Sequence, residues 1–140
     1  MFQLDPQLAS DTQLLGDFPL CRVLLGKDAN YPWCILVPRR DNVTEIYQLA
    51  EQDQRQLLAE SSHLAQTLRH IFNGHKMNVA ALGNVVAQLH LHHIVRYRDD
   101  VAWPGPVWGQ FPGRAYCAEM LQERIDIICD GLAGGFKRIL

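Results

Sequence analysis

The sequence predicts an α+β domain, in which an antiparallel sheet of about five strands packs against one long helix and a C-terminal helix. Three observations lead to this prediction. Short apolar runs bounded by turn residues indicate strands, and a stretch with helical periodicity near the middle of the chain indicates the long helix. The length of 140 residues suits one domain, residues 1–140, whose core needs no disulfide or metal.

The first elements along the chain are a short helix and a hairpin. We expect the helix over Pro6–Leu15, ended by Gly16. Leu20–Leu25 and Trp33–Val37 are apolar runs that indicate two strands. The segment GKDANYP between them contains Asn and Pro, which favour a turn, so the two strands should be antiparallel neighbours.

The long helix is expected over 51–72, because apolar side chains recur there at helical spacing. The apolar stripe consists of Leu57, Leu64, Leu68 and Ile71. The side chains expected in solvent are Gln52, Asp53, Arg55 and Glu60. Asn73 and Gly74 should end the helix, with Gly74 in a left-handed cap.

Two further strands, a loop and a helix complete the predicted order. The strands are Lys76–Ala81 and Ala87–Arg96, connected by residues 82–85. Trp103–Gly113 contains three prolines and three glycines and should be an irregular loop. Arg114–Asp130 should be the C-terminal helix, followed by a Gly-rich tail.

The charge balance restricts the classes of ligand. Thirteen Lys and Arg against 15 Asp and Glu give a formal net charge of −2, which offers no bulk attraction to nucleic acid or to an anionic membrane. A ligand that carries phosphate must therefore be held by local geometry. We expect a small-molecule partner, no nucleic acid and no membrane.

The N-terminus and the cysteines indicate a compartment. The start, MFQLDPQLASD, lacks the basic residues and apolar stretch of a secretory signal, and no apolar run approaches the length of a membrane span. The four cysteines have no C-x-x-C pairing and are expected to be reduced thiols. We therefore expect a cytoplasmic protein.

Three of the six histidines fall within four positions of the predicted strand Ala87–Arg96. Because side chains alternate along a strand, Gln88, His90 and His92 should share one face and His93 the other. Histidine titrates at about pH 6.5, so a neutral imidazole is available to attack phosphorus. A second imidazole about 7 Å along the strand can serve another oxygen of the same phosphate. The shared face therefore holds the candidates for catalysis.

Two other interpretations of the histidines remain open. The strand can be half exposed, with His90 and His92 as ordinary surface residues. The two histidines also form an H-x-H pair, which can chelate a transition metal. A cupin-type metal site expects a carboxylate a few residues downstream, where this chain has Val-Arg-Tyr, so no metal is expected.

The segment Gly83–Arg96, GNVVAQLHLHHIVR, resembles the signature of the histidine-triad (HIT) superfamily. That signature is His-X-His-X-His-X-X, with X apolar, after a Gly-Gln-Ser/Thr-X turn. Leu36–Arg39, LVPR, is similar to the family's strand that ends in Pro-Lys/Arg, and the long helix follows where the family has one. The resemblance covers roughly Cys21–Arg96 and implies the HIT-like form of the α+β fold.

The resemblance implies a nucleotide hydrolase or transferase for phosphoanhydride or phosphoramidate bonds, with substrates of the diadenosine polyphosphate or adenosine phosphoramidate type. His90 would match the nucleophile, which forms a nucleotidyl-histidine that water hydrolyses. His92 would donate to the phosphate oxygens or to the leaving group. The phosphate-binding residues would be Asn78, Gly83 and Asn84, the last two through a turn whose backbone N–H groups can approach phosphate. The resemblance also implies a homodimer and no cofactor.

Four positions depart from the family pattern. Gln88 stands where the first histidine belongs, and a glutamine can orient the nucleophile but cannot titrate. Val85 replaces the usual Ser/Thr, and His93 occupies an apolar position. Asp41, near a site where many members carry a fourth histidine, can orient an imidazole or, as we favour, belong to a turn. Gln88 and Val85 support an alternative, a non-catalytic nucleotide-binding or interaction module with the same fold.

The late loop and two arginines carry further expectations. Trp103 and Trp108 can stack on a base or reach across a dimer, but we favour burial of both rings, which would pin the loop to the domain. Arg39 or Arg96 can supply positive charge to a bound phosphate.

Overall fold

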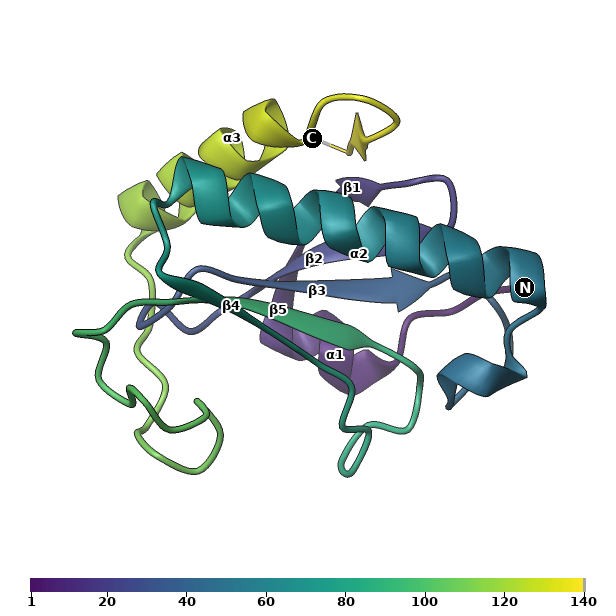
Figure 1. Ribbon diagram of the computed structural model, residues 1–140, viewed down its shortest axis with the longest axis horizontal. Coiled ribbons are helices and arrows are strands. Elements are labelled where there is room, and N and C mark those ends of the chain that lie inside the picture. The colour runs from purple at the N-terminus through teal and green to yellow at the C-terminus, as the bar shows by residue number, and fades with distance from the viewer. Residues whose placement is uncertain (140) are drawn as a thin grey trace.

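The computed structural model describes residues 1–139. The elements in chain order are α1 (Pro6–Asp11), β1 (Thr12–Asp17), β2 (Cys21–Gly26), β3 (Trp33–Pro38), the 3₁₀ turn η1 (Ile46–Gln48), α2 (Glu51–Ile71), β4 (Lys76–Ala80), β5 (Leu91–Arg96), α3 (Ala118–Leu132) and β6 (Lys137–Arg138). The strands form one antiparallel sheet in the order β4-β5-β3-β2-β1-β6. Helices α2 and α3 cover one face, and α1 lies on the other (Figure 1). The predicted α+β class is confirmed, with six strands instead of about five.

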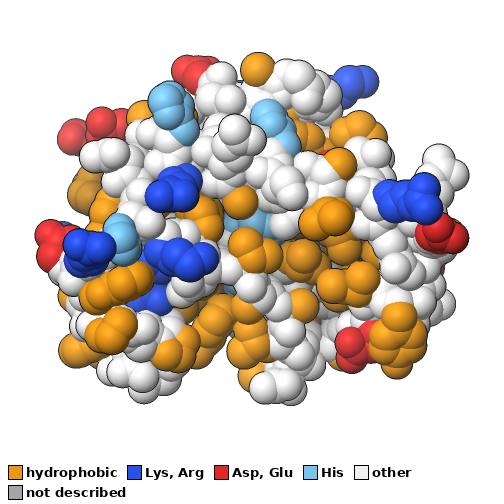
Figure 2. All heavy atoms as spheres, in the orientation of Figure 1, with side chains coloured by type: hydrophobic (Ala, Val, Ile, Leu, Met, Phe, Trp, Pro, Cys, Tyr) orange, Lys and Arg blue, Asp and Glu red, His pale blue; other side chains and the backbone are white. Residues whose placement is uncertain are grey.

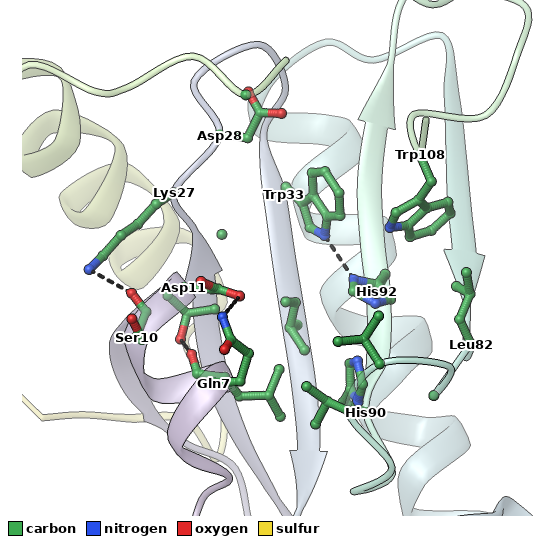
Figure 3. A pocket seen from close by; sticks show the side chains of 18 of the residues that line it. Gln7, Ser10, Asp11, Lys27, Asp28, Trp33, Leu82, His90, His92 and Trp108 are labelled. Carbon is green, nitrogen blue, oxygen red and sulfur yellow. Dashed lines mark hydrogen bonds between the residues drawn. The ribbon is translucent and has the colours of Figure 1, made fainter. Parts of the chain in front are cut away.

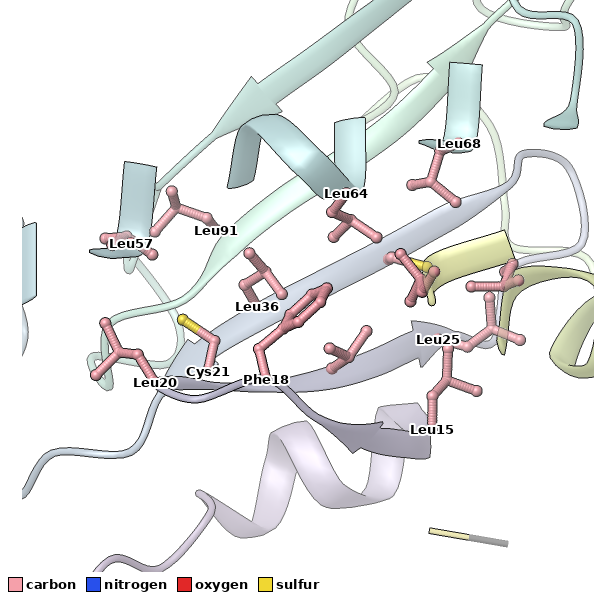
Figure 4. Close-up of a cluster of buried hydrophobic side chains, with 14 of the residues drawn as sticks. Leu15, Phe18, Leu20, Cys21, Leu25, Leu36, Leu57, Leu64, Leu68 and Leu91 are labelled. Carbon is pink, nitrogen blue, oxygen red and sulfur yellow. The ribbon is translucent and has the colours of Figure 1, made fainter. Parts of the chain in front are cut away.

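The main core lies between the sheet and α2. Alternation along the central strands turns Val23 and Leu36 toward α2, whereas Leu24 and Ile35 belong to a smaller cluster under α1. The buried face of α2 contains three leucines that the periodicity predicts, Leu57, Leu64 and Leu68 (Figure 4), together with Glu60 and Ser61. One face of the sheet is thus closed by the core, and the other is left for the site.

The predicted N-terminal helix is wrong over its second half. α1 ends at Asp11, and the residues that follow form β1, paired with β2. Thr12 marks the change, because its hydroxyl donates to the Leu8 carbonyl at 2.6 Å while its backbone is already extended. Gly16 does not end a helix but lies in β1, where a Cβ would collide with the backbone of β6.

The long helix closely matches its predicted range, but two details differ. The left-handed residue after it is Asn73, with a φ of 49°, and not Gly74. Gly74 is needed for space, since a Cβ there would lie 2.5 Å from Cγ1 of Val95. Glu60 is 4% exposed rather than solvated, because its carboxylate accepts hydrogen bonds from two backbone N–H groups at the start of β2.

Two predicted boundaries move toward the C-terminus. β5 begins at Leu91 and not at Ala87, because the residues before it bend away toward the N-terminal segment. α3 begins at Ala118 and not at Arg114, because Arg114 is held by hydrogen bonds to the connection between β2 and β3. Neither α3 nor any other helix within residues 1–139 is both long and apolar enough to cross a bilayer.

Candidate functional site

A cavity of about 730 Å³ opens on the face of the sheet that α1 covers (Figure 3). It is lined by α1, by Trp33 of β3, by the loop over 82–86 and by Trp108 of the late loop. His90 and His92 also line it, so the structure brings the two predicted catalytic imidazoles together. Its volume lies within the range of small-molecule sites, about 300–1,000 Å³.

His90 directly precedes the first residue of β5, and its ring is held by a backbone carbonyl two residues earlier in the chain. Its Nδ1–H donates to the Gln88 carbonyl across 2.6 Å. A neutral imidazole carries one N–H, so this bond leaves Nε2 of His90 with a free lone pair. His90 is 7% exposed and lines the cavity, which is the arrangement a nucleophile needs.

His92 has the opposite tautomer. The indole N–H of Trp33 donates to Nδ1 of His92 at 3.0 Å, so the proton of the neutral ring is on Nε2 (Figure 3). Burial, together with the neighbouring His90 and His93, lowers the pKa of His92 to about 4. At neutral pH His92 is therefore an uncharged hydrogen-bond donor. Its ring centroid lies 4.9 Å from that of His90.

His93 lies on the other face of the sheet, as the alternation predicts. It is fully buried against α2, where its Nε2 is 2.7 Å from the hydroxyl of Ser61, and its Nδ1–H donates to the Leu91 carbonyl at 3.1 Å. Burial lowers the pKa of His93 to about 4. The third adjacent histidine thus belongs to the core and does not reach the cavity.

The remaining predicted site residues divide into two groups. Gly83, with a φ of 74°, and Asn84 line the cavity. Asn78 lies on the same face of the sheet, but it does not line the cavity, and its Oδ1 accepts a hydrogen bond from Arg96 at 2.7 Å. The side chain of Gln88 also points elsewhere, and its carboxamide is bonded to the N-terminal segment.

Asp41 lies outside the cavity. It is exposed and forms a turn with Asn42, whose φ is 57°. The structure therefore agrees with the expectation of a turn and places no carboxylate of this residue beside an imidazole.

The two arginines expected near phosphate are both engaged away from the cavity. Arg39 donates to the carbonyls of Phe18 and Pro19, each at 2.8 Å. Arg96 is 1% exposed and pairs with Asp100 at 2.8 Å. Among the residues that the structure describes, Lys27 is the one Lys or Arg that lines the cavity.

The tryptophan loop, Trp103–Gly113, packs on the sheet and borders the site, but its two indole rings are not fully buried as we favoured. Both rings are half-buried. Trp108 contacts His92 with ring centroids 5.0 Å apart and Trp33 with centroids 5.7 Å apart. Trp103 lies under the guanidinium of Arg96, whose carbon is 5.6 Å from the ring centroid.

Sequence reasoning missed Trp33 and Lys27. Trp33 reaches His92 because Ile35, two residues further along β3, pairs with His92. Lys27 lines the cavity because the hairpin connection passes close to α1, where its Nζ is 3.3 Å from the Ser10 carbonyl. Both placements depend on contacts between segments far apart in the sequence, and no local pattern marks them.

The H-x-H pair has no third metal ligand nearby. Within residues 1–139, no three His, Cys, Asp or Glu side chains gather where they could share a metal ion. Nδ1 of His90 and Nδ1 of His92 are both engaged in hydrogen bonds, so each ring offers only its Nε2.

Comparison with known proteins finds one family model and several solved structures that are similar to this chain. A family model described as HIT domain matches residues 7–99. A histidine triad protein from Marinobacter aquaeolei VT8 has 52% identity and a TM-score of 0.92, covering 94% of this chain and 96% of that one. A histidine triad protein from Bradyrhizobium japonicum has 45% identity and a TM-score of 0.92, covering 94% and 98%. One from Sinorhizobium meliloti 1021 has 37% identity and a TM-score of 0.91, covering 94% and 97%. No curated protein sequence matches the chain.

Proposed function

The chain belongs to the HIT domain family, and we propose that it is a nucleotide hydrolase or transferase that works through His90. Members of this family are generally nucleotide-binding hydrolases or transferases. The observation that carries the proposal is a pair of complementary tautomers in one cavity. Nε2 of His90 offers a lone pair, and Nε2 of His92 offers an N–H.

In the proposed reaction, Nε2 of His90 attacks the α-phosphorus of a nucleotide conjugate. The N–P bond forms while the phosphoanhydride P–O bond or the phosphoramidate P–N bond breaks, and the leaving group takes the electron pair. An amine leaving group also takes a proton from solvent as it departs, and the later attack of water returns a proton to solvent. The imidazole becomes a cation, which the Gln88 carbonyl stabilises through the 2.6 Å bond to Nδ1–H. Water then attacks phosphorus, releases the nucleotide and restores the neutral ring.

His92 would stabilise the charge that develops on phosphorus. Because the pKa of His92 is lowered to about 4, its Nε2–H remains a neutral donor throughout the usual pH range. A preorganised donor in a cavity stabilises a transition-state oxyanion more than water does. His92 would therefore bind a phosphate oxygen or the leaving group by a hydrogen bond and not by full proton transfer.

The loop over 82–86 supports phosphate binding in a chain without excess positive charge. Gly83 has the positive φ that allows the loop to turn, and because the loop lines the cavity, its backbone N–H groups are candidates to bind phosphate there. Within residues 1–139, the N–H groups of Gly83, Asn84 and Val85 donate to no protein acceptor. We keep Asn78 as a phosphate-side residue in the proposal, although its side chain does not line the cavity and its Oδ1 accepts a hydrogen bond from Arg96.

We also propose a homodimer in the cytoplasm. β4 lies at the edge of the sheet, and Val79, Leu82 and Val85, on and after this strand, are exposed by 47%, 44% and 93%. Figure 2 shows hydrophobic side chains gathered on the face that contains β4. A second copy would cover this surface, and light scattering on the purified protein tests for it. The four cysteines are free, three of them buried, which supports a reducing compartment.

The reaction is tested with radiolabelled diadenosine tetraphosphate and, separately, an adenosine phosphoramidate, without added metal. We expect turnover and an acid-labile adenylylated protein, and both should disappear in His90→Ala. His70→Ala removes an exposed imidazole on α2 and is the matched control, with activity unchanged. Turnover that persists in His90→Ala would overturn the assignment of the nucleophile.

The alternative is a nucleotide-binding or interaction module without catalysis. It is favoured by the side chain of Gln88, which faces away from the cavity, and by Val85, which supplies no hydroxyl. Binding of both nucleotides without turnover or labelling would favour this module. Activity that appears only with an added transition metal would instead favour chemistry at the H-x-H pair.

A further inference from the structure

Gln88 connects the motif to the N-terminal segment through both ends of its carboxamide. The Asp5 N–H donates to Oε1 at 2.9 Å, and Nε2 donates to the Gln3 carbonyl at 2.9 Å. These partners lie 83 and 85 residues away along the chain. The side chain therefore binds one extended stretch of backbone as a neighbouring strand would.

The segment held in this way builds a wall of the cavity. Asp5 caps α1, because its carboxylate accepts the Gln7 N–H at 2.8 Å. α1 then places Gln7, Leu8, Ser10 and Asp11 along the cavity. A helix of six residues is too short to be stable alone, so its position depends on tertiary contacts at its start.

The chemistry of the two bonds selects glutamine. A carboxamide presents an acceptor and a donor side by side, which matches the N–H and C=O of an extended backbone. The two nitrogens of an imidazole point in diverging directions, so the histidine that the family pattern expects at position 88 could satisfy only one of these partners. A carboxylate has no donor for the Gln3 carbonyl.

We propose that Gln88 is a positioning residue that latches the N-terminal wall of the cavity and thereby sets the affinity for the nucleotide. The contact between Nδ1–H of His90 and the Gln88 carbonyl involves the backbone alone, so it persists when the side chain is replaced. Changes in the side chain therefore act on binding and leave the nucleophile in place. The inference rests on the proposed nucleotide function, but the movement of the wall can be measured without turnover.

The test compares wild type with Gln88→Leu, which removes both bonds, and Gln88→Glu, which removes the donor. Hydrogen–deuterium exchange should increase over residues 2–11 in both variants and stay unchanged over 51–71. Loss of two hydrogen bonds should raise the Kd for AMP about tenfold in Gln88→Leu. If the enzyme turns over, KM should rise while kcat stays within about twofold.

A second pair of variants changes Asp5, whose backbone N–H donates to the Gln88 side chain. The φ of Asp5 is −53°, which proline accepts, so Asp5→Pro removes the N–H while that residue keeps its own φ. Asp5→Ala removes only the helix cap and is the matched control. Asp5→Pro should increase the exchange over residues 2–11 and the Kd for AMP more than Asp5→Ala does. This difference should vanish in the Gln88→Leu background, because the bond from the Asp5 N–H to Gln88 is already absent there.

The outcomes of these experiments distinguish failure of the proposed role of Gln88 from failure of the proposed reaction. Unchanged exchange over residues 2–11 together with an unchanged Kd for AMP in Gln88→Leu would overturn the latch. A fall in kcat at constant KM would also overturn it, since Gln88 would then act on the reacting atoms. A protein that binds AMP and loosens as described, but never turns over, would keep the latch and reject the proposed reaction.

Discussion

The indole N–H of Trp33 donates to Nδ1 of His92 across 3.0 Å and fixes which nitrogen of that imidazole carries the proton. The contact follows from strand register. Ile35 pairs with His92 between β3 and β5, so Trp33, two residues away, lies on the same face as a diagonal neighbour. A residue at the start of one strand thus determines what a residue on another can donate.

We predict that Trp33→Phe releases this constraint. The ring that packs on Trp108 is largely kept, but the donor to Nδ1 of His92 is lost, so the Nε2–H tautomer is no longer selected. The kcat for nucleotide hydrolysis should fall about tenfold, as when an orienting partner of a functional histidine is removed. Long-range nitrogen–proton spectra of the imidazoles report the tautomer directly. An unchanged Nε2–H tautomer in Trp33→Phe would contradict the prediction.

We predict that acid destabilises the protein through its buried histidines. The pKa of His93 is lowered to about 4 from the usual 6.5, so the unfolded chain binds a proton at a higher pH than the native state does. The contribution of the neutral His93 to the free energy of unfolding is therefore fully present above pH 6.5 and is lost as the pH falls toward 4. At pH 4 the free energy of unfolding has decreased by on the order of 3 kcal/mol through this imidazole alone.

Urea unfolding between pH 7 and pH 4 measures this effect. In His93→Asn the decrease in the free energy of unfolding should be smaller than in wild type by a similar amount, about 3 kcal/mol. His70→Asn, on the exposed side of α2, should retain the full decrease. Equal pH dependence in wild type and His93→Asn would show that another group carries the effect.

Much of the fold could be predicted because the signals are local. The leucine stripe of α2 and the apolar runs of β2 and β3 mark their elements without reference to the rest of the chain. The sequence pattern predicts helix over residues 12–15, because the polar and apolar residues there do not reveal that β1 pairs with β2 and β6. Residues 87–90 were interpreted as strand, because no local feature shows that Gln88 bonds to the N-terminal segment.

The site divides in the same way. His90, His92 and Gly83 stand in one short motif, and the cavity contains all three. Arg39 and Arg96, the two arginines considered as sources of positive charge, do not line the cavity, because they bind partners that only the tertiary structure brings near. The tautomers of the two imidazoles depend on one backbone carbonyl and one indole, and only the second requires the sheet register.

We predict that Arg96 fixes the tryptophan loop. Its guanidinium is 1% exposed and donates to Asp100 and to the Gly105 carbonyl, and it lies over the ring of Trp103. Arg96→Met leaves the buried Asp100 carboxylate without its cationic partner and with only the N–H groups of Tyr97 and Ala102 as donors within residues 1–139, which should lower the free energy of unfolding by about 3 kcal/mol. Combining it with Asp100→Asn should recover part of that loss. Denaturant unfolding measures both, and an additive double variant would contradict the pairing.

We predict that Lys27 discriminates between substrates by their number of phosphates. Among the described residues it is the one Lys or Arg that lines the cavity, so a polyphosphate chain has more charge to interact with it than a single phosphoramidate does. Lys27→Met should raise the KM for diadenosine tetraphosphate several-fold, roughly three to ten, and change that for adenosine phosphoramidate much less.

Added salt should weaken the preference of the wild type for diadenosine tetraphosphate, since the lysine is exposed. Lys137→Met removes an exposed lysine on β6, outside the cavity, and should leave both KM values unchanged. Equal increases in KM for both substrates in Lys27→Met would show that the lysine positions the cavity wall through its bond to the Ser10 carbonyl and does not bind the phosphate chain.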